Sequence, residues 1–284
     1  PILILGSFWP GQERAIVDWN LTPVIYSSEQ AFLLESAAAL AGKVVDYHVK
    51  IDTGMGRIGV PYRETDALAN KLSAAKSIRL DGLMTHFAVA DDLEQLDFTN
   101  EQIDRFDHVV QKFRDLGFDP THFDLANSPG AIAHPRSRRT MVRLGGILYG
   151  LGGDVLPGGI DKPVLRPVLS LRSSIAYLKT VAAGETIGYG RTFRTVRDSR
   201  IASVPIGYAD GYPRSLSNIG TVLVNGTAAP VVGRISMDWT MIDVTDVPDA
   251  MVGGHVTLIG ANGRSAILTE DLAAATGTIF YEIT

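Results

Sequence analysis

The 284-residue sequence contains no cysteine, no hydrophobic run long enough to cross a bilayer and no cluster of basic residues. The absence of cysteine excludes disulfides, thiolate nucleophiles and cysteine-ligated metals, and we predict no metal site. The absence of a long apolar run and of a signal-peptide pattern predicts no membrane contact and favours a cytoplasmic protein. Lys and Arg number 26 against 31 Asp and Glu, and this net charge of -5 argues against nucleic-acid binding.

The first half of the chain alternates short β-rich runs with helical patterns. Strands are expected at residues 2–5, 23–26, 44–52, 80–86, 122–126 and 141–144. Helices are expected near 12–19, 28–40 and 63–75, and from a capping box at Thr99 and Gln102 to Gly117. Ser128 as N-cap with Pro129 at the first helical position predicts another helix start. Repeated β and α segments at these spacings predict an α/β fold with a parallel sheet, closed or open.

The second half of the chain is β-rich from about Pro163. Strands are expected at 165–181, 201–206, 221–224, 230–235, 240–244 and 255–259, and the last seven residues also read as a strand. Asn225-Gly226 predicts a tight hairpin, and helical periodicity returns only at 268–275. We therefore expect a domain boundary in the 152–162 loop, followed by a mostly antiparallel β domain.

The strand that ends at Asp52 has two different faces. Apolar side chains lie on one face and polar ones on the other: Val45, Tyr47, Val49 and Ile51 against Asp46, His48, Lys50 and Asp52. A Gly-Met-Gly turn then leads to Arg57. This pattern fits a barrel with polar chemistry inside, whose active site lies at the carboxyl ends of its strands. The alternative is a solvent-exposed antiparallel edge strand with a glycine turn.

Several residues at predicted strand ends could bind a ligand. Ser128 and the pair Gly145-Gly146 could together cradle a phosphate, or could be an ordinary cap and turn. Arg143 on an apolar strand needs an acceptor, either a neighbouring Asp or a cofactor atom. His86, which ends its strand, reads as structural or solvated when taken by itself.

The β domain contains three unusual stretches, each with glycine next to residues that could contact a ligand. They are Gly188-Tyr189-Gly190, the GYADGY segment at 207–212 and the GRISMD segment at 233–238. A tyrosine between glycines can approach a ligand, although one such tyrosine more often covers a hydrophobic edge. Three such stretches in one small domain favour a binding site.

An ordered set of motifs resembles the alanine racemase family, whose members are pyridoxal 5'-phosphate enzymes. The motifs are KIDTGMGRIGV (50–60), THFAVAD (85–91), ANSPG (126–130), VRLGGILYG (142–150), IGYGRT (187–192), PIGYADGYPR (205–214) and VGRISMD (232–238). The resemblance implies an incomplete TIM-like (β/α)8 barrel at residues 1–160 that binds the cofactor. It also implies a truncated C-terminal β domain at residues 161–284.

The resemblance also implies a role for each matching residue. Tyr189 matches the tyrosine of a two-base Lys/Tyr mechanism. Residues implied at the cofactor are His86 and Arg143 at the ring, and Ser128, Gly145, Gly146 and Tyr281 at the phosphate. Residues implied at the substrate are Arg57, Met237 and Tyr208, the last of these at the access channel. Lys50 matches a lysine that is carbamylated in many members.

The family's Schiff-base lysine motif, which resembles VKANAYGHG, does not occur in the sequence, nor does a final β segment. We therefore expect a fragment that is inactive alone, from a parent protein that interconverts L-alanine and D-alanine for peptidoglycan synthesis. A head-to-tail homodimer with shared active sites is implied. Two alternatives stay open: a racemase of the same fold for serine or a basic amino acid, and a non-catalytic pyridoxal-phosphate-binding or interaction protein.

Overall fold

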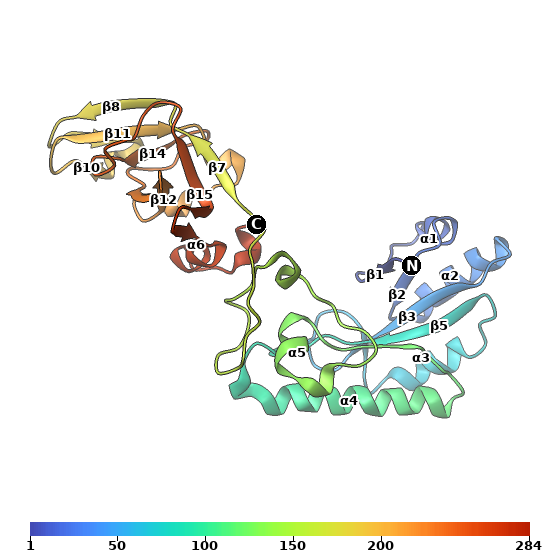
Figure 1. Cartoon of the computed structure of the whole chain (residues 1–284). Coiled ribbons are helices and arrows are strands. Elements are labelled where there is room, and N and C mark those ends of the chain that lie inside the picture. The colour runs from blue at the N-terminus through green and yellow to red at the C-terminus, as the bar shows by residue number, and fades with distance from the viewer. The chain divides into compact units, whose positions relative to one another are not determined.

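The structure is a computed structural model that describes all 284 residues (Figure 1). It divides into two compact units. Unit 1 comprises residues 1–145 and 156–162, and unit 2 comprises residues 146–155 and 163–284. The predicted division between residues 160 and 161 stays a prediction. None of the helices combines the length and hydropathy needed to cross a bilayer.

Unit 1 is built on a parallel sheet with the strand order β1-β2-β3-β5-β6, and β4 pairs with β3. Its strands are β1 (Leu3–Ile4), β2 (Thr22–Ile25), β3 (Val45–Asp52), β4 (Val60–Pro61), β5 (Ile78–Met84) and β6 (His122–Asp124). Its helices are α1 (Glu13–Asp18), α2 (Ser28–Leu40), α3 (Thr65–Leu72), α4 (Leu96–Asp115) and α5 (Ser128–Ala133). Parallel strands joined by helices form the part of a TIM-like barrel that the sequence predicts.

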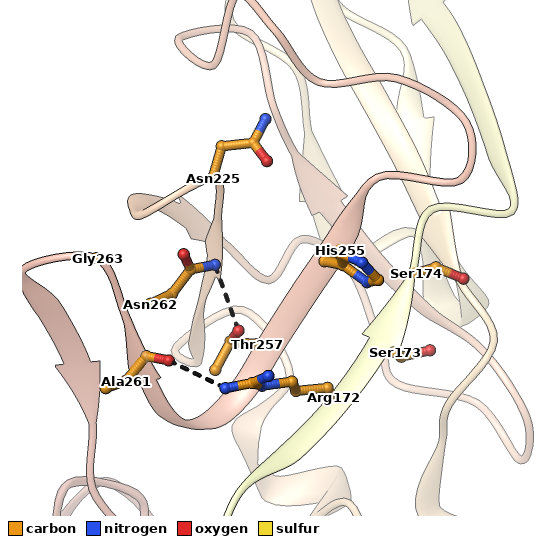
Figure 2. A pocket seen from close by; sticks show the side chains of 9 residues that line it. All are labelled: Arg172, Ser173, Ser174, Asn225, His255, Thr257, Ala261, Asn262 and Gly263. Atoms are coloured by element: carbon orange, nitrogen blue, oxygen red, sulfur yellow. Dashed lines mark hydrogen bonds between the residues drawn. The ribbon is translucent and has the colours of Figure 1, made fainter.

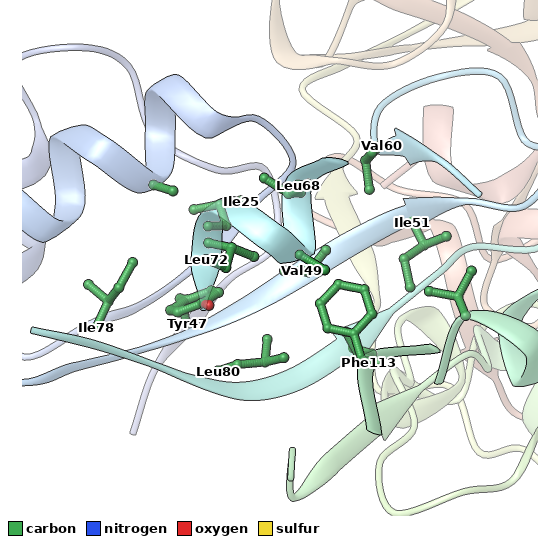
Figure 3. Packing of buried hydrophobic residues seen from close by; sticks show 14 of the residues in the cluster. Ile25, Tyr47, Val49, Ile51, Val60, Leu68, Leu72, Ile78, Leu80 and Phe113 are labelled. Carbon is green, nitrogen blue, oxygen red and sulfur yellow. The ribbon is translucent and has the colours of Figure 1, made fainter. Parts of the chain in front are cut away.

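The two faces of β3 explain where the core of unit 1 lies. Tyr47, Val49 and Ile51 are buried in one hydrophobic cluster with residues of α2, α3 and α4 (Figure 3). Figure 3 shows Leu68 and Leu72 of α3 and Phe113 of α4 among the side chains of this cluster. The opposite face of β3 carries His48 and Lys50, which are also buried. The predicted division of β3 into an apolar and a polar face is confirmed.

Three local predictions for unit 1 are wrong. Residues 141–144 form no strand, and only Met141 makes an isolated parallel bridge to Asp124. Thr99 and Gln102 do not cap a helix, because α4 begins at Leu96 and both side chains are buried within it. The N-cap of α5 is Asn127, whose side chain accepts a hydrogen bond from the Gly130 N–H at 3.0 Å, and Ser128 is the first helical residue.

Unit 2 is a mostly antiparallel β domain, as predicted. Strands β14-β11-β8 form one sheet, β13-β12-β15-β16 with β7 on β15 form another, and β9 pairs with β10. The strands are β7 (Leu171–Ser174), β8 (Tyr177–Val181), β9 (Thr186–Ile187), β10 (Phe193–Arg194), β11 (Ser199–Val204), β12 (Thr221–Val224), β13 (Thr227–Pro230), β14 (Thr240–Asp243), β15 (His255–Asn262) and β16 (Ser265–Ile267). Helix α6 (Thr269–Thr276) follows β16.

The turn chemistry of unit 2 is predicted better than its strand ends. Asn225 and Gly226 both have positive φ and join β12 to β13, which confirms the hairpin. The strand expected at 165–181 is two strands, β7 and β8, and β13 ends at Pro230 where a strand was expected to start. Near the carboxyl terminus, Phe280–Glu282 is a 3-10 turn and the predicted strand is wrong.

Candidate functional site

Arg143 is the centre of a polar cluster in unit 1, where the strands β5 and β6 end. Its Nη2 donates to the Thr85 carbonyl at 2.9 Å and to Nδ1 of His86 at 3.1 Å, and lies 3.4 Å from the Leu125 carbonyl. Its Nη1 forms an ion pair with Asp124, which is fully buried. No hydrogen bond occupies Nε. The guanidinium is therefore held through both terminal nitrogens and keeps one N–H available as a donor.

Burial and the charge of Arg143 lower the pKa values of two neighbours. Burial, reinforced by the charge of Arg143, lowers the pKa of His86 to about 4, so its imidazole is neutral at neutral pH. Lys50 is 6% exposed, and burial together with the charges of Arg143 and Arg57 lowers its pKa to about 8. The charge of Arg57 also lowers the pKa of His86. These four predicted residues therefore form one electrostatic cluster.

A buried amide of α4 supports this cluster. The Gln102 Nε2 donates to Thr53 Oγ1 and to the His86 carbonyl, both at 3.1 Å, and its Oε1 accepts from the Ala88 N–H at 3.0 Å. The hydroxyls of Thr53 and Thr85 lie 2.7 Å apart. The capping-box pattern predicts a helix cap at Gln102 and does not reveal these hydrogen bonds. Gln102 lies next to Ile103 and four residues before Phe106, on the buried face of α4. This helical spacing could have indicated that its amide is buried and hydrogen-bonded.

Ser128 and Gly145 lie together in unit 1, as the phosphate hypothesis requires. The Ser128 Oγ accepts a hydrogen bond from the Gly145 N–H at 3.1 Å, and Ser128 is 4% exposed. Because Asn127 caps α5, the Ser128 hydroxyl is not needed for capping and its proton is free to be donated.

Gly146 and Tyr281 both lie against the ring of Phe280 in unit 2. A Cβ on Gly146 would lie 2.4 Å from the ring of Phe280, so a side chain there would have to displace this ring. The ring of Tyr281 lies against that of Phe280 with the centroids 3.9 Å apart. Tyr281 is 49% exposed, which leaves its hydroxyl accessible.

The three glycine-rich stretches of the β domain are neighbours within unit 2. Tyr189 is 73% exposed on a 3-10 turn, between two glycines that pack against Arg234 of the third stretch. The Tyr208 N–H donates to the Ser236 carbonyl and the Ala209 N–H to the Met237 carbonyl, both at 3.0 Å. The structure thus brings Tyr189, Tyr208 and Met237 onto adjoining loops, and their individual roles stay predictions.

Unit 2 also contains an open pocket that no sequence pattern predicts. It has a volume of about 610 Å³ and lies along β7 and β15 (Figure 2). Figure 2 shows Arg172 reaching the Ala261 carbonyl, at 3.5 Å, and Asn262 reaching Thr257, at 3.4 Å. None of the predicted site residues lines this pocket, so it is separate from the candidate site.

Comparison with known proteins identifies the protein family. The alanine racemase N-terminal domain matches residues 1–152, and the alanine racemase C-terminal domain matches residues 168–284. The chain belongs to the alanine racemase family. An alanine racemase of Geobacter sulfurreducens is 44% identical over 288 residues, covering all of this chain and 74% of the relative.

Solved structures agree with this family assignment. The alanine racemase of Bacillus anthracis with bound L-Ala-P matches with a TM-score of 0.87 and 34% identity, over 100% of this chain and 72% of that one. The Bartonella henselae alanine racemase with covalently bound pyridoxal phosphate gives 0.86 and 29%, over 99% and 75%. A histidine racemase of Leuconostoc mesenteroides gives 0.88 and 30%, over 100% and 75%.

Proposed function

We propose that the protein is an alanine racemase that interconverts L-alanine and D-alanine with pyridoxal phosphate. The observation that carries the proposal within unit 1 is the fixed Arg143 guanidinium, which has a free Nε–H and a neutral His86 beside it. A permanently charged donor that does not give up its proton suits a pyridine nitrogen that must accept a hydrogen bond and stay unprotonated.

The residues of the chain fit pyridoxal phosphate in their donor chemistry. Arg143 would hold the ring nitrogen. The resemblance implies phosphate contacts from the Ser128 hydroxyl, the backbone N–H groups of Gly145 and Gly146, and the Tyr281 hydroxyl. In unit 1 the Gly145 N–H donates to Ser128 Oγ, which leaves the Ser128 proton for a phosphate oxygen. When bound, this cofactor withdraws electrons from the α-carbon of an amino acid, so that its proton can be removed.

The remaining predicted residues would act on the substrate. Tyr189 would exchange the α-proton on the L-face, and its exposure on a 3-10 turn leaves its side chain accessible. Arg57 and the Met237 N–H would hold the substrate carboxylate, and Tyr208 would line the access channel. A head-to-tail homodimer would bring Tyr189 and Met237 of one subunit to the cofactor of the other.

A modified Lys50 would hold the Arg57 side chain in place. A carbamate on Lys50 would turn a cation into an anion able to form a charge-assisted pair with that guanidinium. The lowered pKa of Lys50, about 8, favours this modification because only the neutral amine reacts with carbon dioxide.

The test is D-alanine formation from L-alanine with added pyridoxal phosphate. Since the sequence contains no match to the family's Schiff-base lysine motif, the assay uses this chain joined to a lysine-bearing N-terminal segment, with the 284-residue chain as its control. D-Alanine from the joined protein and none from the control is the expected result. A protein that binds the cofactor and turns over no alanine would contradict the proposal. Supply of D-alanine for peptidoglycan would place this activity in the cytoplasm.

A second candidate is a racemase for another amino acid. The similarity to a histidine racemase, at a TM-score of 0.88, is the observation that favours it. Serine, histidine, lysine and arginine belong in the same assay, because the wider substrates would need more room beside Tyr208 and Met237. A non-catalytic binding protein would bind the cofactor and turn over none of these substrates.

A further inference from the structure

We propose that Asp124 is the positioning residue of Arg143, a role that rests on the proposed function of Arg143 as the donor to the cofactor ring. Asp124 ends β6 and is fully buried. In register it lies in one row with Met84 of β5 and Lys50 of β3, so its side chain belongs to the polar face of the sheet. No pattern in the sequence marked this residue.

The carboxylate of Asp124 depends on Arg143. Apart from the ion pair with Nη1, neither of its oxygens has a hydrogen bond within the chain. Burial raises the pKa of Asp124, while the charges of Arg143 and Lys50 oppose this shift. A buried carboxylate that loses its one partner is left as an uncompensated charge, which is strongly destabilising.

Arg143 depends equally on Asp124 for its orientation. Its other contacts, to the Thr85 and Leu125 carbonyls and to His86, all run through Nη2. A guanidinium held through one terminal nitrogen can still turn about that contact, whereas a second contact through Nη1 fixes its plane. Asp124 therefore determines the direction of the unoccupied Nε–H.

Asp124 also balances the charge of the cluster. Arg57 and Arg143 both repel Lys50, and Asp124 is the fully buried carboxylate that attracts Arg143 and Lys50. With Asp124 paired to Arg143, a carbamate on Lys50 would be left to pair with Arg57. Each guanidinium would then have an anion of its own.

The test is a double-mutant cycle with Asp124→Asn, Arg143→Ala and the double variant of the 284-residue chain. The control Asp46→Asn breaks the exposed Asp46–Arg79 pair of the same sheet. Pyridoxal phosphate, followed by its absorbance, is expected to bind about tenfold more weakly to Asp124→Asn, and the double variant is expected to bind no more weakly than Arg143→Ala. Additive losses would overturn the proposal.

A second readout does not need the cofactor. Asp124→Asn is expected to shift the ¹⁵N resonance of His86 Nδ1, because the donor Nη2 of Arg143 moves, and Asp46→Asn is expected to leave it in place. An unchanged His86 resonance in Asp124→Asn would overturn the positioning role. A His86 resonance that shifts in Asp124→Asn, together with a wild-type chain that binds no pyridoxal phosphate, would support the positioning role and count against the proposed function.

Discussion

Arg143 donates from Nη2 to Nδ1 of His86 over 3.1 Å, which requires that nitrogen to be unprotonated. The neutral imidazole then carries its proton on Nε2. Burial and the guanidinium charge act in the same direction, since both disfavour a second proton on the ring. The pair therefore has one net charge, which resides on Arg143.

This relationship predicts how His86 titrates. The pKa of His86 in the folded chain is about 4, below the value of about 6.5 in the unfolded chain. The unfolded state therefore binds more protons between these pH values, and stability contributed by neutral His86 is lost as pH falls through this window. His86→Asn is expected to flatten the pH dependence of the free energy of unfolding there. An NMR titration of His86 with a midpoint near pH 6.5 would contradict the prediction.

Lys50 is expected to form a carbamate. With a pKa of about 8, about half of the amine is neutral at pH 8, and it can form a bond to carbon dioxide as its proton leaves. ¹³C NMR in labelled bicarbonate is expected to detect a carbamate in the wild-type chain and none in Lys50→Arg. An equal signal from both proteins, or a signal from neither, argues against modification at Lys50.

Gln102→Ala is expected to lower the free energy of unfolding by about 2 kcal/mol, because it leaves the half-buried Ala88 N–H and His86 carbonyl without their partner. Gln111→Ala is the matched control on α4, since its bond to Asp115 is exposed and its loss is expected to cost less than about 0.5 kcal/mol. Urea denaturation measures both. Equal losses would mean that the Gln102 network contributes little.

Gly207→Ala is expected to destabilise unit 2 by about 2 kcal/mol or more. A Cβ there would lie 2.2 Å from the carbonyl oxygens of Ser236 and Met237, which are backbone atoms and cannot move aside cheaply. Gly153→Ala is the control, because its Cβ would lie 3.6 Å from the nearest atom, Glu270 Oε1. A Gly207→Ala protein with the denaturation midpoint of wild type would rule out this close approach.

The sequence predicts features that repeat or are local. The period of two along β3 separates Val49 from Lys50, and Asn225-Gly226 specifies a hairpin whatever surrounds it. The motif order also identifies the family, because it needs no knowledge of contacts. These predictions are confirmed by the structure and by the comparisons.

The predictions fail where a side chain has two possible partners. Asn127 and Ser128 are both good N-caps, and only the tertiary contact between Ser128 and Gly145 separates their roles. Gln102 reads as half of a capping box, but its partners come from the loops that follow β3 and β5. Asp124 has no local signal at all, because its partner Arg143 is defined by the fold.

The most direct test of the account is D-alanine formation by Tyr189→Phe in the joined, lysine-bearing protein. Loss of the phenol removes the proposed L-face base, so activity is expected to fall by about a hundredfold or more, with pyridoxal phosphate affinity unchanged. Tyr177→Phe, another exposed tyrosine of unit 2, is the control and is expected to retain full activity. A Tyr189→Phe protein that forms D-alanine at the rate of this control would contradict the account.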